Sequence, residues 1–286
     1  MPIDISRVLG APLGPIEYDY TEKDVILYAL GIGFGAKPLD PSHLRYTYEN
    51  GLVAFPTFGV IPPSGGMAQF LGLPGLDINM MMLLHGEQRL EMHGPPIPPA
   101  GRLVTRGKVE AIYDKGKGAL TVFRLTTSDA QNRPIFSNVV SFFIRGEGGF
   151  GGESGPPVGN FSPDRAPDQV VEYPTLPQQA LIYRLSGDRN PLHVDPAFAA
   201  MGGFDRPILH GLCSFGHVGR AVVEAFGGDD PARLGSLEVR FAKPVFPGET
   251  IATHLWDAGG GKVLLKAVAK ERGVEVITNG LATLKS

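Results

Sequence analysis

A stretch of thirteen residues holds a carboxylate, a carboxamide and an imidazole that could exchange protons with one small molecule. It reads YRLSGDRNPLHVD, residues 183–195, and its polar groups include Asp188, Asn190 and His193. Gly, Pro, Asn and Asp are also the usual residues of turns, so a purely structural interpretation stays open. An acid and an imidazole five residues apart can still meet at one ligand if the chain bends between them. Asn190-Pro191 supplies such a bend, because proline fixes its own backbone and restricts the preceding residue.

A free backbone amide is the third component of the predicted site. In PILHGLC, residues 207–213, a long apolar segment begins at His210-Gly211, and the first N–H groups of a helix have no acceptor within the helix. Gly211 has no side chain to block a ligand, so its amide is free to donate to a carbonyl oxygen that gains negative charge. Acid, imidazole and amide together predict an addition or elimination next to a carbonyl group. Capping and turn formation are the alternative explanation.

Two helices are expected to position these groups. Asp195 followed by Pro196 is typical of an N-cap with proline at the first helical position, and it predicts a short helix over PAFAAM, residues 196–201. A longer helix is predicted over LHGLCSFGHVGRAVVEAFGG, where two glycines end it. Its internal glycines lower the helix propensity and are expected to let a sheet pack close against it. Its apolar stripe comprises Leu212, Phe215, Val218, Val222, Val223 and Phe226.

The sequence contains an internal repeat on either side of a segment rich in glycine and proline. That segment, GEGGFGGESGPPVGNFSPDRAPDQV at residues 146–170, cannot form a helix or a central strand. LEMHGPPIPPAG at residues 90–101 matches LEVRFAKPVFPG at residues 237–248, and three alternating, strand-like segments follow each of them. The repeat predicts two related units.

Each unit combines a potential helix with several antiparallel strands, which predicts an α+β fold with a sheet wrapped around a helix in each half. We expect one domain over residues 1–147, a linker over residues 148–168 and a second domain over residues 169–286. Periodicity alone does not specify the strand order.

The two units differ at the predicted site. VILYALGIGFGAKPLD, residues 25–40, can be laid over ALIYRLSGDRNPLHVD, residues 180–195. The first unit keeps the frame and lacks both the acid and the imidazole, which favours chemistry in the second unit. The overlay pairs Tyr28 with Tyr183, Leu30 with Leu185, Gly33 with Asp188, and Lys37 or Pro38 with His193.

Composition and charge exclude several classes of function. The 286 residues carry 26 Lys and Arg against 29 Asp and Glu, and this net charge of −3 does not suggest a nucleic-acid surface. The single cysteine, Cys213, cannot form an intrachain disulfide, which fits a reducing compartment, and we expect it in the core. The amino terminus lacks the pattern of a signal peptide, and apolar runs such as residues 80–84 are too short to cross a bilayer. We expect a cytoplasmic protein that does not associate with membranes.

Neither a cofactor nor a metal is expected. GIGFGA, residues 31–36, fits the Gly-x-Gly-x-x-Ala spacing of a dinucleotide site, but Pro38 and Pro41 interrupt the helix that such a site requires. The seven histidines include no HExxH pair, and the sequence has no CxxC pair.

The region around the predicted site resembles a known family signature. YRLSGDRNPLHVDPAFAAMGGFDRPILHGLCSFG, residues 183–216, is similar to the signature of the MaoC-like (R)-specific enoyl-CoA hydratases, the hydratase 2 group. LLHGEQRLE at 83–91 and DKGKG at 114–118 resemble the amino-terminal half of the two-domain members, and RFAKPVFPG at 240–248 resembles their carboxy-terminal half. The resemblance implies a double hot-dog fold. It also implies reversible syn hydration of trans-2-enoyl-CoA to (3R)-3-hydroxyacyl-CoA.

The resemblance further implies a role for each site residue. Asp188 and His193 would hold and activate a water molecule, without an indication of which is the base and which is the acid. Asn190 would orient the water or the acyl group, and the Gly211 amide would bind the thioester oxygen. The implied substrate-binding residues are His85 and Gly86 on the substrate path, Lys115 near a coenzyme A phosphate, and Phe241 against the ligand.

In this family interpretation the first domain binds the acyl tail and is not catalytic. Its residues 61–84, IPPSGGMAQFLGLPGLDINMMMLL, are rich in glycine and proline and predict only a broken central helix. Coenzyme A would be part of the substrate, and a homodimer is expected. Two other functions stay open: a thioesterase on the same fold, and a non-catalytic module that binds acyl-CoA or an acyl carrier.

Overall fold

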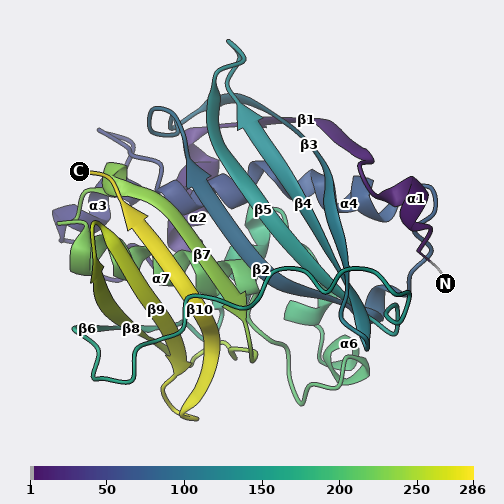
Figure 1. Cartoon of the computed structure of the whole chain (residues 1–286). Coiled ribbons are helices and arrows are strands. Elements are labelled where there is room, and N and C mark those ends of the chain that lie inside the picture. The colour runs from purple at the N-terminus through teal and green to yellow at the C-terminus, as the bar shows by residue number, and fades with distance from the viewer. Residues whose placement is uncertain (1–2) are drawn as a thin grey trace.

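The protein is built on one continuous, strongly curved antiparallel sheet of ten strands (Figure 1). The computed structural model describes residues 3–286, apart from the side chain of Met81. The strands are β1 (Pro12–Tyr20), β2 (Leu83–Met92), β3 (Gly101–Asp114), β4 (Gly118–Ser128), β5 (Pro134–Arg145), β6 (Gln169–Pro174), β7 (Leu234–Phe241), β8 (Thr250–Gly259), β9 (Lys262–Ala269) and β10 (Val274–Leu284).

The strand order reflects the repeat seen in the sequence. It runs β1-β3-β4-β5-β2-β7-β10-β9-β8-β6, so the second half repeats the order of the first half in reverse. The halves join between β2 and β7, where Leu90 lies opposite Leu237, the two leucines that open the matched segments. The predicted α+β architecture and the six predicted strands, β3 to β5 and β8 to β10, are therefore confirmed. The outermost strands β1 and β6 were not predicted, and β2 and β7 overlap the matched repeat segments without having been predicted as strands.

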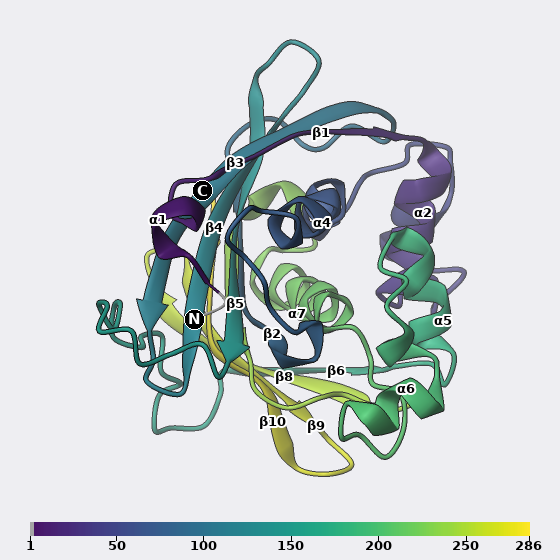
Figure 2. The same cartoon turned by 90° about the vertical axis from the view of Figure 1, so that its right-hand side faces the viewer.

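The helices lie mainly on the concave side of the sheet (Figure 2). There α4 and α7 run inside the curve, and α2 and α5 pack against each other farther out. None of the helices in residues 3–286 is both long enough and apolar enough to span a membrane. The helices are α1 (Ile5–Val8), α2 (Glu22–Gly31), α3 (Pro41–Thr47), α4 (Gly65–Leu71), α5 (Gln179–Tyr183), α6 (Pro196–Met201) and α7 (Gly211–Phe226), with short 3-10 turns η1 (Pro56–Val60), η2 (Pro62–Ser64), η3 (Met80–Met82), η4 (Arg184–Ser186), η5 (Pro191–His193) and η6 (Pro231–Arg233).

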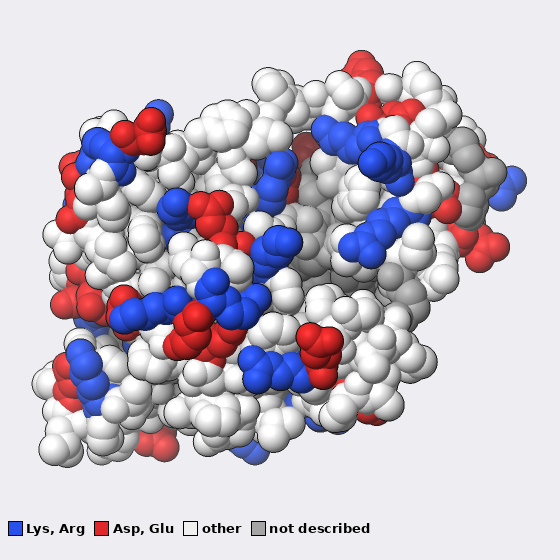
Figure 3. Space-filling view, turned by 90° about the horizontal axis from the view of Figure 1, so that it is seen from below, with Lys and Arg blue, Asp and Glu red and all other residues white. Residues whose placement is uncertain are grey.

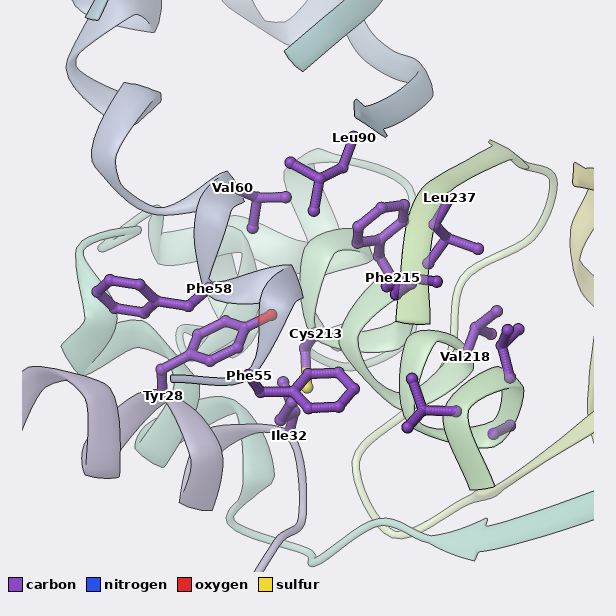
Figure 4. Close-up of a cluster of buried hydrophobic side chains, with 14 of the residues drawn as sticks. Tyr28, Ile32, Phe55, Phe58, Val60, Leu90, Cys213, Phe215, Val218 and Leu237 are labelled. Carbon is purple, nitrogen blue, oxygen red and sulfur yellow. The ribbon is translucent and has the colours of Figure 1, made fainter. Parts of the chain in front are cut away.

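The long helix α7 is the centre of the larger hydrophobic core. It has the predicted start and is capped by Gly227, and its residues from Cys213 to Val223 are all buried. Figure 4 shows why: side chains of α2 and η1, among them Tyr28 and Phe58, close over the face of α7 that points away from the sheet. The predicted core position of Cys213 is confirmed.

The glycines of α7 serve a different contact from the one expected. A Cβ at Gly216 would lie 2.4 Å from Ile32, and one at Gly219 would lie 2.7 Å from Thr57. Both neighbours belong to the first half, and only the side chain of Leu237 at Gly219 comes from the sheet. The missing side chains therefore mainly let the first domain pack onto α7, which the sequence pattern of one half could not reveal.

The first half has only a broken central helix, as predicted. The turns η1 and η2 precede α4, which has seven residues, and the chain then continues irregularly to η3 and β2. The sixteen-residue α7 thus has a much shorter counterpart.

The segment between β5 and β6 forms neither helix nor strand and crosses the outer face of the sheet (Figure 1). It is held at several points. The Asp114 carboxylate accepts the N–H groups of Gly149 and Gly151, both at 2.8 Å. Farther along, the Asn279 amide donates to the Gly159 carbonyl at 2.8 Å. The glycines and prolines therefore form a strap that is fixed to the sheet.

Candidate active site

The loop that carries the predicted polar residues is shaped by its own side chains. Gly187 adopts a φ of 131°, a conformation that favours glycine. The Asp188 carboxylate accepts the Asn190 N–H at 3.0 Å, and the Asn190 side-chain oxygen accepts the Leu192 N–H at 3.0 Å, which caps η5. Part of the turn-forming interpretation is thus correct. Both side chains nevertheless stay exposed, so each keeps further hydrogen-bonding capacity for a ligand.

His193 is buried and is oriented by the backbone. Its Nδ1 lies 2.8 Å from the Ile208 carbonyl oxygen. Because a carbonyl can only accept, Nδ1 carries a proton, and in the neutral ring Nε2 keeps its lone pair. Burial lowers the pKa of His193 below its ordinary value, which favours this neutral ring at neutral pH. Its position just before α6, whose N-cap is Asp195 as predicted, is set by the local sequence.

A third polar group, His210, was not among the predicted site residues. Its ring stacks on that of His193 with centroids 3.7 Å apart and planes 28° apart. Its Nε2 donates to the Asp188 carbonyl at 3.1 Å, which ties the loop to the start of α7. Burial, followed by the neighbouring His193, lowers the pKa of His210 to about 3. In the sequence, only its position directly before Gly211 marks His210. Its role depends on its contact with the ring of His193, which lies seventeen residues earlier in the chain.

The structure brings the acid and the two imidazoles together. One oxygen of Asp188 and one ring nitrogen from each of His193 and His210 lie within 4.8 Å of one another. Such a set has the composition of a metal site. Metal ligation requires in-plane lone pairs that converge on one point, whereas stacked rings direct theirs side by side. The arrangement is better suited to proton exchange with a molecule at the exposed Asp188 side.

Gly211 and three predicted binding residues form the adjoining wall. Gly211 is the first residue of α7, and the Phe241 ring lies 3.3 Å from where its Cβ would be. That ring in turn packs against His85, with centroids 4.9 Å apart. Burial lowers the pKa of His85 to about 4. Gly86 follows in β2, beside β7.

Lys115 lies apart from this group. It is exposed in the predicted hairpin between β3 and β4, and its Nζ donates to the Ser154 carbonyl of the strap. The strand registers place this hairpin at the same end of the sheet as Leu83, because Gly118 and Leu83 pair with neighbouring residues of β5. The structure therefore leaves Lys115 near the site's end of the sheet without a contact to the site residues.

The face seen from below carries clustered positive charge. Figure 3 shows Lys and Arg side chains around a hollow on this face of the molecule. A hollow rimmed by cations attracts anionic ligands such as phosphates.

Comparison with known proteins places the chain in a class and then in a family. A crystal structure of a MaoC-like dehydratase from Phytophthora capsici superposes with a TM-score of 0.88 at 39% identity and covers 99% of both chains. A Mycobacterium tuberculosis protein with a double hot-dog fold is 14% identical and shares the fold with a TM-score of 0.60, covering 96% of both chains. The predicted double hot dog is thereby confirmed.

The family follows from the sequence matches. Residues 18–146 match the model of the MFE-2 hydratase 2 N-terminal domain, and residues 159–280 match that of the MaoC like domain. A Dictyostelium discoideum protein named probable enoyl-CoA hydratase 2 is 44% identical over 100% of this chain and 98% of its own length. The chain belongs to the MaoC-like hydratase 2 family.

Proposed function

We propose that this protein catalyses the reversible syn hydration of trans-2-enoyl-CoA to (3R)-3-hydroxyacyl-CoA at the loop of Asp188 and His193. The observation that supports it most directly is the meeting of carboxylate and imidazole within 4.8 Å beside the start of α7. The relatives named enoyl-CoA hydratase 2, which match along the whole chain, support the reaction class.

The chemistry requires one water to be held by two acceptors. The ionised Asp188 and the neutral Nε2 of His193 each accept one of its hydrogens, which aims the water oxygen at C3 of the enoyl group. As the C3–O bond forms, one of the two acceptors takes a proton from the water. The electron pair of the C2–C3 double bond moves toward the thioester, and C2 then receives a proton from the site. General acid–base help of this kind contributes on the order of 10²–10⁴ in rate.

Gly211 would stabilise the intermediate charge. The thioester oxygen becomes enolate-like when C3 is attacked, and the first amide of α7 has no acceptor within its helix. A donor aimed at such an oxygen is typically worth on the order of 10²–10³ in turnover. Phe241 and His85 would close this wall around the acyl group, and Asn190 would orient the water.

The first domain would bind the acyl tail. Its central helix ends at Leu71, and the segment that follows exposes the large apolar side chains Met80, Met82 and Leu84. Flexible methionine side chains adapt to ligands of different shape. The cation-rimmed hollow of Figure 3 would receive the coenzyme A phosphates.

The test is the hydration of crotonyl-CoA by Asp188→Asn and His193→Gln. Each variant should lose on the order of 10²–10⁴ in kcat, because each loses its proton-exchanging group. The exposed Lys37, which lies in the counterpart loop, provides the control: Lys37→Gln should keep the wild-type rate. Wild-type rates in both site variants would overturn the assigned chemistry.

The same assay separates the alternatives. Hydration removes the enoyl absorbance and releases no thiol, whereas a thioesterase would release coenzyme A that a thiol reagent detects. A non-catalytic binding module would change neither signal.

We also propose a homodimer. Large apolar side chains stand exposed on and beside α5, with Leu181 at 55% and Leu185 at 54% exposure, and association would cover them. Sedimentation equilibrium should give twice the chain mass, and a stable monomer would refute this part.

A further inference from the structure

A buried arginine outside the proposed active site has no ion-pair partner in the part of the chain that the structure describes. Arg220 on α7 is 4% exposed, and its guanidinium is held between the rings of Phe34 and Tyr173 at 4.1 and 4.0 Å. Its Nη1 donates to the Ile32 carbonyl at 2.7 Å. Across residues 3–286 no carboxylate forms an ion pair with it. Aromatic faces offset only part of the cost of burying an unpaired charge.

Arg220 lines a small cavity into which other unsatisfied donors project. The cavity is bounded by α3, α7 and β6, and its volume for a water-sized molecule is about 30 Å³. One water molecule needs roughly 10–15 Å³ on the same scale. Three lining atoms are buried without a hydrogen-bond partner: Nε of Arg220, Nε of Arg45 and the hydroxyl of Tyr46. Two of these are N–H donors on cations, and no acceptor of the described residues lies within hydrogen-bond distance of them.

Tyr46 and His43 present donors as well, whereas the Ser42 hydroxyl donates to Asp40 at 2.7 Å. Burial raises the pKa of Tyr46 to about 12, so its hydroxyl keeps its proton. His43 accepts the Gly35 N–H at Nδ1, at 3.0 Å, which leaves the proton of the neutral ring on Nε2. Burial and the charge of Arg220 lower the pKa of His43 and favour this neutral form.

The two carboxylates that line the cavity are at its exposed rim. Glu224 accepts the hydroxyl of Tyr173 at 2.5 Å. Asp229 is engaged through its backbone carbonyl, which accepts from Arg45. Both are exposed residues, so solvent screens their charges, and neither reaches the inner guanidinium as an ion pair.

We propose that this cavity binds a monovalent inorganic anion of chloride size, held by Arg220, Arg45 and Tyr46. Water would satisfy the hydrogen bonds but would leave the buried positive charge balanced only by the solvent-screened carboxylate of Glu224. The bound anion joins α3 of the first half to α7 of the second half and thereby stabilises the contact between the two domains.

Bromide provides a direct probe, because it replaces chloride and scatters anomalously. Crystals of the full chain grown in sodium bromide should give an anomalous peak between Arg220 Nε and the Tyr46 hydroxyl. Tyr46→Phe should weaken this peak, and Tyr48→Phe at the exposed tyrosine two residues further on should not. An ordered water without anomalous signal, or bromide confined to surface positions, would overturn the proposal.

A solution measurement tests the same site without crystals. The Tm of the wild type should rise and saturate as sodium bromide replaces sodium gluconate at constant ionic strength, because an anion that binds only the folded state stabilises it. Tyr46→Phe should raise the half-saturating bromide concentration about tenfold, the equivalent of one lost hydrogen bond. If Tyr46→Phe does not fold, Arg45→Met serves instead. An equal salt response in wild type and variants contradicts the assignment.

Discussion

The two repeat-related loops, residues 25–40 and 180–195, share a frame and differ in what surrounds them. Their tyrosines Tyr28 and Tyr183 face each other with ring centroids 6.0 Å apart. Each loop ends in an aspartate that caps a short helix with proline at its first turn, α3 in one case and α6 in the other. The backbone plan has therefore been kept in both halves, whereas the acid and the imidazole occur only in the second.

The residues around Gly33 explain why the first loop has no space for an acidic side chain at this position. A Cβ at Gly33, the counterpart of Asp188, would lie 2.9 Å from Nη1 of Arg220 and 3.0 Å from Nε2 of His217. Side chains of the long helix α7 occupy that place. The helix α4 of the other half is short, and Asp188 remains exposed. In the first half, side chains of α7 fill the position that corresponds to Asp188, and the loop lacks the acid and the imidazole. In the second half the corresponding position is open, and both groups are present.

The largest expected effect concerns buried imidazoles at both places, His217 beside Gly33 and His210 and His85 at the proposed active site. Burial lowers the pKa of His217 and His210 to about 3 and that of His85 to about 4, all from an ordinary 6.5. Below pH 6.5 the unfolded chain therefore binds more protons than the folded chain, so the free energy of unfolding falls as the pH falls. The loss from these three groups should be about 3 kcal/mol between pH 6.5 and 5.5.

Urea unfolding at these two pH values measures the loss. His217→Asn should reduce it by about 1 kcal/mol, the share of one such ring. Equal stability at both pH values would show that these rings are not neutral in the folded protein.

The next largest effect concerns the activity of the proposed active site in the second half. Gly211→Ala should lower kcat on the order of 10²-fold, because the new methyl group meets the Phe241 ring and displaces the reacting carbonyl from the amide. Alanine suits the helix, so the Tm should hardly change. Steady-state kinetics and thermal unfolding of the same preparation check both parts. A fall in Tm that accounts for the lost activity would contradict the amide's proposed role.

The sequence predicted some of the strands and helices and missed others. Alternation between glycine and proline boundaries predicted six strands, and the apolar stripe with its glycine stop predicted α7. Strands β1 and β6 escaped because they lie at the edges, where a proline such as Pro12 is tolerated and the usual alternation is weaker.

Tertiary contacts account for what the sequence could not predict at the site. Asp188 and His193 are close in sequence, so a bend suffices to bring them together. The stacking of His210 on His193 and the contact of His85 with Phe241 require the assembled fold. The same applies to Arg220, which looks like an interruption of an apolar helix until the first domain covers it.

A smaller expected effect concerns stability, and it tests whether side chains of α7 fill the space beside Gly33. Gly33→Ala should destabilise the protein by about 2–4 kcal/mol, from a φ of +83° and from crowding against Arg220 and His217. Gly51→Ala is the matched control, with a φ of +75° and no neighbour within 4 Å, and it should cost only the backbone part of about 1–2 kcal/mol. Chemical denaturation compares the two. Equal costs would mean that the filled site exerts no steric constraint.

The smallest expected effect concerns Lys115, where the predicted phosphate contact competes with the observed bond to Ser154 in the strap. Lys115→Met should raise the KM for crotonyl-CoA only about threefold, because an exposed point charge contributes well under about 1 kcal/mol. The exposed Lys117→Met in the same hairpin is the control. Crotonyl pantetheine, which lacks the phosphates, discriminates the two roles. If its KM also rises, the lysine acts through the strap, and the phosphate contact is excluded.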